Sequence, residues 1–299
     1  MAAPYQAVIL AAGRGSRLTE HTREMPKALL PIGPRSLTDA TPTSFLRRQV
    51  EILRELGVRD IVVVVGCLKQ LILDEAKRWD VPLRFVVNPT DDMATSGSLH
   101  SFQFAARSEH GVLDMTKQTL LMDGDIVYHR GALQLLLDAS EHSSMLVSSA
   151  FDGDDEEVLV WGSVERPRFL GKAMTPSLVS NEGCLGEAFG IVKFAPADHT
   201  LVRESMDWML GDPSADPDTG RFRGFGPARR ATEHEELTQR FMRYRKMRCV
   251  MAGQDLPFME CDDAREYKKV RESFYPALLQ LEAAQNAGTG GANDAEGKG

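Results

Sequence analysis

The sequence predicts an α/β fold built on a doubly wound, mostly parallel sheet, and three observations support this class. Strand and helix signals alternate through the first half of the 299-residue chain, which is the order that βαβ units produce. Asp60–Val65 is a continuous β-branched run, as a strand covered on both faces requires. Val8–Ala12 is a second apolar run, and it opens directly into Gly13 and Gly15. Ligands of such a sheet bind at the carboxyl ends of its strands, where this glycine turn lies.

The remaining elements follow from apolar spacing and from the residues that interrupt it. Apolar residues at every third or fourth position predict helices at 45–56, 69–78, 95–106, 131–139, 201–210 and 264–273. Short aliphatic runs predict strands at 83–87, 120–122, 145–150, 158–164 and 190–194, and a short strand near 257–260. Residues 211–220 are rich in Asp, Pro and Gly and indicate a turn-rich insertion. Residues 283–299 have no apolar periodicity and predict a disordered tail.

Composition argues against several classes of protein. Hydrophobic residues make up 42% and charged residues 26% of the chain, as in ordinary soluble domains. No apolar run is long enough to cross a bilayer, and the first strand lacks the basic flank of a signal peptide. Four scattered cysteines without a Cys-x-x-Cys pair argue against a zinc site or a disulfide framework, and they predict a cytoplasmic location. The net charge of −8 argues against nucleic acid as a partner, and the basic residues within 221–230 are interpreted as a solvated loop. We expect neither nucleic acid nor a membrane as a partner.

The glycine turn has the residue types that bind phosphate. Successive backbone N–H groups in such a turn form an anion-binding concavity, and Arg17 can place its guanidinium fork on phosphate oxygens. Lys27 adds a compact charge within Pro26-Lys27-Ala28-Leu29. Two other phosphate-binding turns do not fit. The Gly-Lys-Ser/Thr of a P-loop is absent, and Leu18 occupies the third glycine position of the dinucleotide fingerprint.

These segments resemble the signature of the nucleotidyltransferases that make nucleoside-diphosphate sugars and CDP-alcohols, roughly L-A-A-G-x-G-[ST]-R-L followed by P-K-x-L. The resemblance implies a Rossmann-like nucleotidyltransferase fold over residues 1–282. It also implies a nucleotide-binding half at about 1–150 and a smaller acceptor-binding half at about 151–282. The implied nucleotide contacts begin with Leu10, Ala11, Ala12, Gly13, Arg14, Gly15 and Ser16.

Two aspartate motifs bring further chemistry. Asp123-Gly124-Asp125 follows an apolar strand, so its carboxylates are predicted at the carboxyl edge of the sheet. Carboxylates there can hold Mg²⁺ against a triphosphate. Asp262 lies between a short strand and the predicted helix 264–273, and it is either a second Mg²⁺ ligand or the N-cap of that helix.

Within this superfamily, the chain resembles the choline-phosphate and phosphonate cytidylyltransferases over about residues 6–272. That resemblance implies Mg²⁺ as the cofactor, held by Asp125 and Asp262. It implies that Gly97, Ser98 and Asp123 belong to the nucleotide pocket. A Gly-Glu-x-x-Gly-Ile-x-Lys-Phe segment and a His-Glu-Glu step supply the implied acceptor-binding residues, Glu187, Glu235 and Glu236.

The implied reaction transfers CMP from CTP to a small anionic acceptor, such as phosphocholine or an alkylphosphonate, and releases pyrophosphate. Arg17, Lys27 and Lys172 are the implied catalytic residues. Two alternatives stay open. One is a sugar-1-phosphate nucleotidylyltransferase, although Glu165-Arg166-Pro167 differs from the Glu-Lys-Pro expected there; the other is a catalytically silent regulatory or binding subunit of the same fold. Departures from the subgroup at 35–44 and 211–230 leave the acceptor open. The sequence does not decide the oligomeric state, for which a homodimer is one candidate.

Overall fold

The structure, a computed structural model, describes residues 4–90, 96–152, 157–173, 182–210 and 232–290. The strands within these ranges are β1 (Tyr5–Ala11), β2 (Pro31–Pro34), β3 (Pro42–Ser44), β4 (Asp60–Val65), β5 (Arg84–Val87), β6 (Gln118–Asp123), β7 (Ile126–Tyr128), β8 (Ser144–Ser148), β9 (Leu159–Ser163), β10 (Arg166–Gly171), β11 (Cys184–Phe194), β12 (Arg248–Ala252) and β13 (Phe258–Glu260). The α-helices are α1 (Thr19–Thr22), α2 (Phe45–Glu55), α3 (Lys69–Ala76), α4 (Ser98–Ala106), α5 (Arg130–Asp138), α7 (His199–Leu210), α8 (His234–Arg243), α9 (Ala264–Lys269) and α10 (Tyr275–Gly290). Short 3-10 turns lie at Ser16–Leu18, Lys27–Leu29 and Pro196–Asp198, and a π-helical turn at Val270–Phe274 joins α9 to α10.

A nine-stranded sheet organises the described part of the chain. Its path is β10-β9-β11-β6-β1-β4-β5, and β8 and β12 extend it from β11. β6, β1, β4 and β5 are parallel neighbours. β11 runs antiparallel to β6, β8 and β9 and joins the two halves of the sheet. The predicted α/β class with a mostly parallel central sheet is confirmed.

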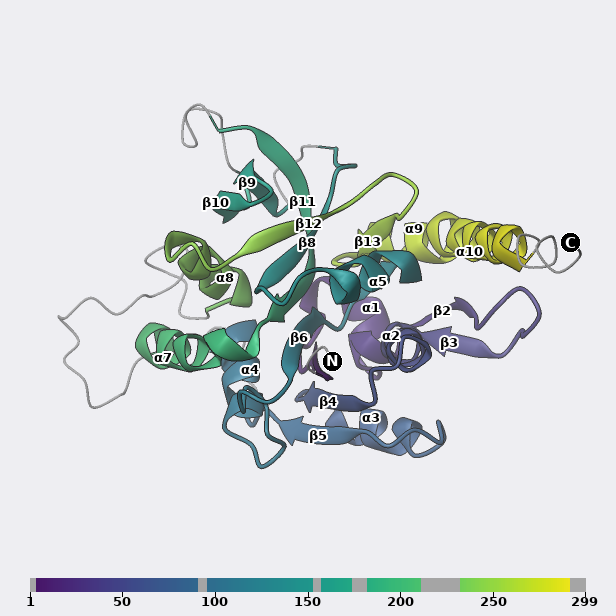
Figure 1. The fold of residues 1–299 in the computed structure, drawn as a ribbon. Coiled ribbons are helices and arrows are strands. Elements are labelled where there is room, and N and C mark those ends of the chain that lie inside the picture. The colour runs from purple at the N-terminus through teal and green to yellow at the C-terminus, as the bar shows by residue number, and fades with distance from the viewer. Residues whose placement is uncertain (1–3, 91–95, 153–156, 174–181, 211–231, 291–299) are drawn as a thin grey trace, which may run out of the picture.

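Helices cover both faces of the sheet, and side-chain alternation along β4 shows how. Ile61, Val63 and Val65 pack into one core cluster with α2, α3 and α5. Val62 and Val64 pack into the opposite cluster with α4, α7 and α8. Figure 1 shows α4, α7 and α8 to the left of the sheet and α2 and α5 to its right. All five valine and isoleucine side chains are buried, as the continuous apolar run requires.

A third core cluster attaches the C-terminal helices. Tyr275 of α10 is fully buried, and its hydroxyl donates to the carbonyl oxygen of Pro34. Arg48 of α2 forms an ion pair with Glu282 of α10, with Nη2 and Oε1 2.8 Å apart. The predicted disordered tail is therefore wrong for 283–290, because α10 continues to Gly290 from a well-anchored start. Residues 291–299 of the predicted tail lie outside the described residues.

Most predicted elements are found within a few residues of their expected ends. The structure differs from the predictions in one inserted segment and in several short strands. The departure at 35–44 forms the turn and the second strand of a β-hairpin of β2 and β3, and β2 packs against α10. Sequence patterns missed β7, β10 and β12, which are short or irregular in burial. The predicted insertion 211–220, the basic residues within 221–230 and the first residue of the helix predicted at 95–106 lie outside the described residues. Within the described ranges, no helix combines the length and the apolar character that a bilayer crossing needs.

Lys193 on β11 is a charged side chain in the middle of this core. It is fully buried, and its Nζ donates to the carbonyl oxygens of Leu136, Ala139 and Ser140 at 2.9, 3.1 and 3.0 Å. These carbonyls belong to the last turn of α5 and the residues after it, so the ammonium caps the negative end of the helix. Burial lowers the pKa of Lys193 to about 8.

The lowered pKa of Lys193 predicts a stability that rises with pH. The folded chain releases this proton near pH 8, whereas an unfolded lysine keeps it to about pH 10.4, so unfolding takes up a proton between these values. We expect the free energy of unfolding of the wild type to rise by about 2 kcal/mol between pH 7 and pH 10 relative to that of Lys193→Met. Urea unfolding of both proteins at the two pH values measures this difference. Equal pH dependence in both proteins would contradict it.

Candidate active site

A cleft of about 470 Å³ opens at the carboxyl ends of β1, β5 and β6. One wall consists of the glycine turn after β1 and the cations that follow it. The opposite wall comes from the turn after β6, from β13 and from the start of α8. The lining residues are Leu10, Ala11, Ala12, Gly13, Gly15, Ser16, Arg17, Lys27, Ala28, Asn88, Thr90, Ser96, Gly97, Ser98, Ser101, Asp123, Gly124, Asp125, Val158, Gly171, Lys172, Glu233, Glu235, Glu260 and Asp262.

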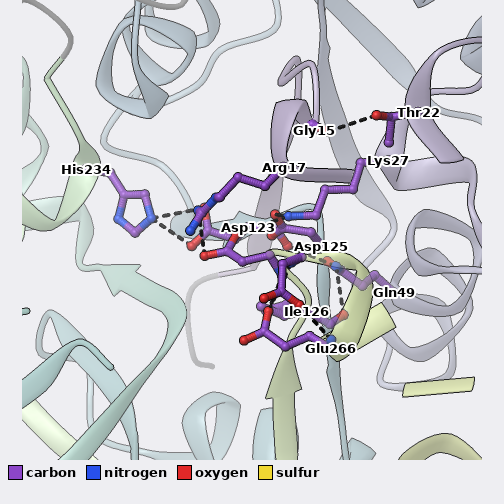
Figure 2. Close-up of polar contacts among 12 residues, drawn as sticks. Gly15, Arg17, Thr22, Lys27, Gln49, Asp123, Asp125, Ile126, His234 and Glu266 are labelled. Atoms are coloured by element: carbon purple, nitrogen blue, oxygen red, sulfur yellow. Dashed lines mark hydrogen bonds and ion pairs between the residues drawn. The ribbon is translucent and has the colours of Figure 1, made fainter. Parts of the chain in front are cut away.

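The glycine turn is held by the helix that follows it. Gly15 has φ +62°, a conformation that favours glycine, and a Cβ there would lie 2.8 Å from the methyl group of Thr22. The Thr22 hydroxyl donates to the carbonyl oxygen of Gly15 at 2.8 Å, which Figure 2 shows. A Cβ on Gly13 would meet no atom within 4 Å. Gly15 is therefore required by the fold of the turn, whereas the space beside Gly13 is open.

Three carboxylates converge in the cleft. Oxygens of Asp125, Glu260 and Asp262 all lie within 4.8 Å of one another. β13 pairs with β7, which begins just after Asp125, and the backbone N–H of Cys261 donates to the Asp125 carbonyl oxygen at 3.2 Å. This pairing brings Asp262 beside Asp125, 137 residues earlier in the chain. Burial, together with the neighbouring Asp125 and Asp262, raises the pKa of Glu260 well above its ordinary value.

Neighbouring groups fix the backbone on which these carboxylates stand. Gln49 of α2 donates from Nε2 to the carbonyl oxygens of Asp123 and Ile126, at 2.9 and 3.3 Å (Figure 2). These two bonds hold the turn that carries Asp125. The N-cap of α9 is Asp263, whose Oδ1 accepts from the backbone N–H of Glu266 at 2.8 Å. The alternative role of Asp262 as the N-cap is therefore wrong, and its carboxylate faces the cleft.

Cations surround the three carboxylates. Lys27 Nζ lies 2.5 Å from Asp125 Oδ2 and 3.2 Å from Asp262 Oδ1, and Arg17 Nη2 lies 2.7 Å from Asp262 Oδ2. Lys172 Nζ is 4.0 Å from Asp262 Oδ2. Burial alone would lower the pKa of Lys27, but Asp125 and Asp262 raise it above its ordinary value. Burial opposes ionisation of Asp262, yet Lys27 and Arg17 hold the pKa of Asp262 below its ordinary value. Lys27 and Asp262 are therefore both charged at neutral pH.

His234 and Asp123 form a buried ion pair at the edge of the cleft. His234 Nε2 is 2.9 Å from Oδ2 and 3.1 Å from Oδ1 of Asp123, and Figure 2 shows both contacts. Burial disfavours the imidazolium, but Asp123 raises the pKa of His234 to about 10. Burial raises the pKa of Asp123 to about 6, against the effect of His234. The pair is thus ionised at neutral pH, and the Asp123 carboxylate is fixed at the cleft wall.

The structure brings most of the predicted site residues together, with three exceptions. All but three of the predicted catalytic, nucleotide-binding, acceptor-binding and metal residues line the cleft. Among the described residues, Arg14 is exposed outside the lining, Glu236 is buried in α8, and Glu187 lies on β11 opposite Ser148. Glu235 is the predicted acceptor-binding residue that reaches the cleft. The roles of these residues stay predictions.

Sequence reasoning missed several residues of the cleft. Glu260 is two positions before Asp262, and strand alternation could have placed both side chains on one face. Asn88 directly follows β5 and donates from Nδ2 to the hydroxyls of Ser96 and Ser101, both at 3.0 Å. The contact between His234 and Asp123 joins residues 111 positions apart, and no local pattern indicates it.

The first half of the chain matches a known protein family. Residues 7–178, over half of the chain, match the MobA-like NTP transferase domain. The chain belongs to this family. The glycine turn, Lys27, Asp125 and Lys172 all fall inside the matched segment of the MobA-like NTP transferase, whereas Glu260 and Asp262 come after it.

Individual relatives of this MobA-like NTP transferase include cytidylyltransferases. It is 32% identical over 214 residues to CMP-5'-(3-aminopropyl)phosphonate synthase of Streptomyces rubellomurinus, covering 68% of this chain and 31% of that protein. It is 26% identical over 145 residues to CTP:phosphoglutamine cytidylyltransferase of Campylobacter jejuni, covering 48% of this chain and 53% of that protein. The chain thus spans between about a third and about half of the length of these relatives.

A solved structure supports the fold over nearly the whole chain. CTP:phosphocholine cytidylyltransferase of Streptococcus pneumoniae superposes with a TM-score of 0.63 at 18% identity, covering 90% of this chain and 98% of that one. At this level of identity the likeness concerns the fold. It includes the second half of the chain, beyond the matched family segment.

Proposed function

We propose that this protein is a cytidylyltransferase that transfers CMP from CTP to a small phosphorylated or phosphonate acceptor and releases pyrophosphate. One observation carries the proposal: a single cleft holds a glycine turn with Arg17 and Lys27 on one side and the carboxylates of Asp125, Glu260 and Asp262 on the other. A triphosphate needs the first set and its metal ion needs the second. The relatives named for CTP-dependent reactions support the choice of nucleotide.

The proposed reaction is an in-line displacement at phosphorus. An oxygen of the acceptor's phosphate or phosphonate attacks the α-phosphorus of CTP and forms a new P–O bond. The bond from the α-phosphorus to the bridging oxygen breaks, and pyrophosphate leaves with the electron pair. The attacking oxygen is already anionic at neutral pH, so the reaction needs no general base. The protein contributes position and compensating charge.

The cations of the cleft have distinct proposed tasks. Arg17, with about half of its side chain exposed, binds the β- and γ-phosphates, for which its forked donors are suited. Lys27 is nearly buried and contacts the α-phosphate or the attacking oxygen. Lys172 lies on the acceptor side, just after β10, and binds the acceptor's anionic end. All three lie at or near ion-pair distance from Asp262, so phosphates and carboxylates compete for the same cations.

We propose Mg²⁺ as the cofactor, and the donor set fits this ion. Asp125, Glu260 and Asp262 offer carboxylate oxygens alone, which hard divalent cations prefer. Burial raises the pKa of Glu260, and the negative charges of Asp125 and Asp262 raise it further, so a bound cation would favour the ionised form of this carboxyl. When bound, Mg²⁺ supplies Lewis-acid stabilisation of the negative charge on the phosphoryl oxygens. The three side chains hold the ion, and β13 keeps them together.

The acceptor side of the cleft favours a compact, polar acceptor. Val158, Gly171 and Lys172 lie there with Glu235 and Glu260. Glu235 Oε2 is buried without a hydrogen-bond partner among the described residues and lies 3.9 Å from His234 Nε2. A hydroxyl or ammonium group on the acceptor would bind the part of the Glu235 carboxylate that lines the cleft. We propose Glu235 as the residue that contacts the acceptor's tail.

The four cysteines, all unpaired, support the proposed cytoplasmic location.

Pyrophosphate release tests this function. The purified protein with Mg²⁺ receives CTP, UTP, GTP, ATP or dTTP, each with pooled phosphocholine and amino- or hydroxyalkylphosphonates, or with pooled sugar 1-phosphates. We expect release with CTP and the first pool, and a CMP-linked product by mass spectrometry. Arg17→Ala serves as the matched control, with a rate lowered about a hundredfold. Release with sugar 1-phosphates alone would replace the proposal with a sugar-nucleotide synthase, and silence across the matrix would favour a binding subunit.

A further inference from the structure

The N-termini of α4 and α8 meet at one carboxylate beside the cleft. Both the backbone N–H and the hydroxyl of Ser98 donate to Glu233 Oε2, at 2.9 and 2.8 Å. The Ser98 hydroxyl in turn accepts from the backbone N–H of His234 at 2.8 Å. Leu99 N–H donates to the Thr232 carbonyl oxygen at 3.1 Å. Each helix therefore caps the other, although the capping residues lie 135 positions apart.

This mutual cap provides hydrogen-bond acceptors for backbone N–H groups at the start of both helices. The first N–H groups of a helix have no partner within it, and its N-terminus attracts negative charge. Glu233 supplies that charge to the start of α4, and the Ser98 hydroxyl supplies an acceptor to the first N–H group of α8. The two ends approach so closely that a Cβ on Gly97 would overlap the carbonyl oxygen of Thr232. The contact therefore depends on glycine at position 97.

The mutual cap joins two walls of the cleft. On the α4 side, Asn88 holds Ser96 and Ser101, and all three line the cleft beside Gly97. On the α8 side, the next two residues after Glu233 are His234, which holds Asp123, and Glu235, which lines the cleft and is proposed above to contact the acceptor. A shift of either helix must move the other or break the cap. The cap thus directly connects the lining residues beside α4, which are proposed to contact the nucleotide, with Glu235 of α8, which is proposed to contact the acceptor.

We infer that Ser98 and Glu233 are positioning residues that couple the binding of nucleotide and acceptor, so that each ligand tightens the binding of the other. This inference rests on the proposed function. A nucleotide that orders the start of α4 also fixes the start of α8, and so fixes Glu235 before the acceptor arrives. Coupling of this kind is reciprocal and typically changes affinity by 5–150-fold, so we expect about tenfold.

The test measures a ratio of affinities. The dissociation constant of 3-aminopropylphosphonate is determined by calorimetry with Mg²⁺, with and without α,β-methylene-CTP, which cannot release pyrophosphate. We expect the nucleotide analogue to tighten binding about tenfold in the wild type. In Ser98→Ala and Glu233→Ala the ratio should fall to about one, and in Ser98→Thr, which keeps the hydroxyl, it should largely return. Ser108→Ala removes a hydroxyl bonded to the Ala105 carbonyl at the other end of α4 and should keep the ratio of the wild type.

The experiment distinguishes failure of the proposed coupling from failure of the proposed function. General loss of stability alters both dissociation constants alike and leaves their ratio unchanged, so a structural role alone does not mimic the expected result. If the wild type releases pyrophosphate with CTP and an acceptor but Ser98→Ala and Glu233→Ala keep the tenfold ratio, the coupling is wrong and the proposed function stands. If the wild type binds neither ligand and releases no pyrophosphate, both are overturned.

Discussion

Replacement of Lys27 by methionine should lower the rate of CMP transfer at saturating substrates by about a thousandfold. Lys27 is 11% exposed and contacts both Asp125 and Asp262 at the centre of the cleft. Methionine keeps the length and apolar stem of the side chain and removes its charge, so the loss falls on charge compensation. The transition state of phosphoryl transfer depends on that compensation, since its charge is spread over the phosphoryl oxygens. Steady-state pyrophosphate release with CTP and the best acceptor measures kcat.

Lys77→Met is the matched control for this substitution. Lys77 is 72% exposed on the far end of α3 and pairs with Asp74, outside the cleft. Its replacement should leave kcat within about twofold of the wild type, because exposed ion pairs contribute little. A Lys27→Met protein that folds, binds CTP and turns over at more than a tenth of the wild-type rate would show that the charge is not needed.

Replacement of Asp262 by asparagine should abolish most activity and weaken metal binding. One carboxylate charge is removed from the cluster of Asp125, Glu260 and Asp262, while the shape of the side chain is kept. We expect a loss of about a thousandfold in kcat and at least a tenfold higher Mg²⁺ concentration for half-maximal rate. Electron paramagnetic resonance of Mn²⁺, titrated into the protein without substrates, measures the affinity for the metal apart from turnover.

Asp263→Asn controls for the neighbouring position. The Asp263 carboxylate caps α9 instead of lining the cleft, and asparagine is an equally good N-cap. This variant should therefore bind Mn²⁺ like the wild type and retain full activity. Equal Mn²⁺ affinity in Asp262→Asn and the wild type would remove Asp262 from the proposed metal site.

The parts of the fold and site that the sequence predicts are those set by local pattern. The β-branched run of β4 was predicted with its observed ends, because a strand buried on both faces needs an unbroken apolar run. The glycine turn and Lys27 both follow β1, Lys27 by 16 residues, and the motif that joins them is visible in the sequence. The convergence of Asp125 and Asp262 is different. It depends on the pairing of β13 with β7, and the resemblance to cytidylyltransferases suggested it where spacing could not.

Long-range packing and an irregular strand explain where the structure differs from the predictions, namely at Glu187, at Glu236 and at residues 283–290. The register of β11 shifts between Ala188 and Val192, and Gly190 has a positive φ of 69°. Simple alternation along this strand therefore does not report which face Glu187 presents. Glu236 is one residue after Glu235, so the two point in different directions on α8, and one of them is buried. The end of α10 has the composition of a tail, but Tyr275 and Glu282 anchor the helix from within the core.

The pairing of β13 with β7 also bears on how the protein is made. Chains are synthesised from the N-terminus, and folding begins in the part that has already emerged. Glycine turn, Lys27 and Asp125 emerge early, whereas Glu260 and Asp262 arrive only with the last fifth of the chain. A chain that has not yet reached β13 thus carries Asp125, one of the three carboxylates of the cluster, without the strand that brings Glu260 and Asp262 beside it. The carboxylate cluster is therefore complete only after β13 has been synthesised and has paired with β7.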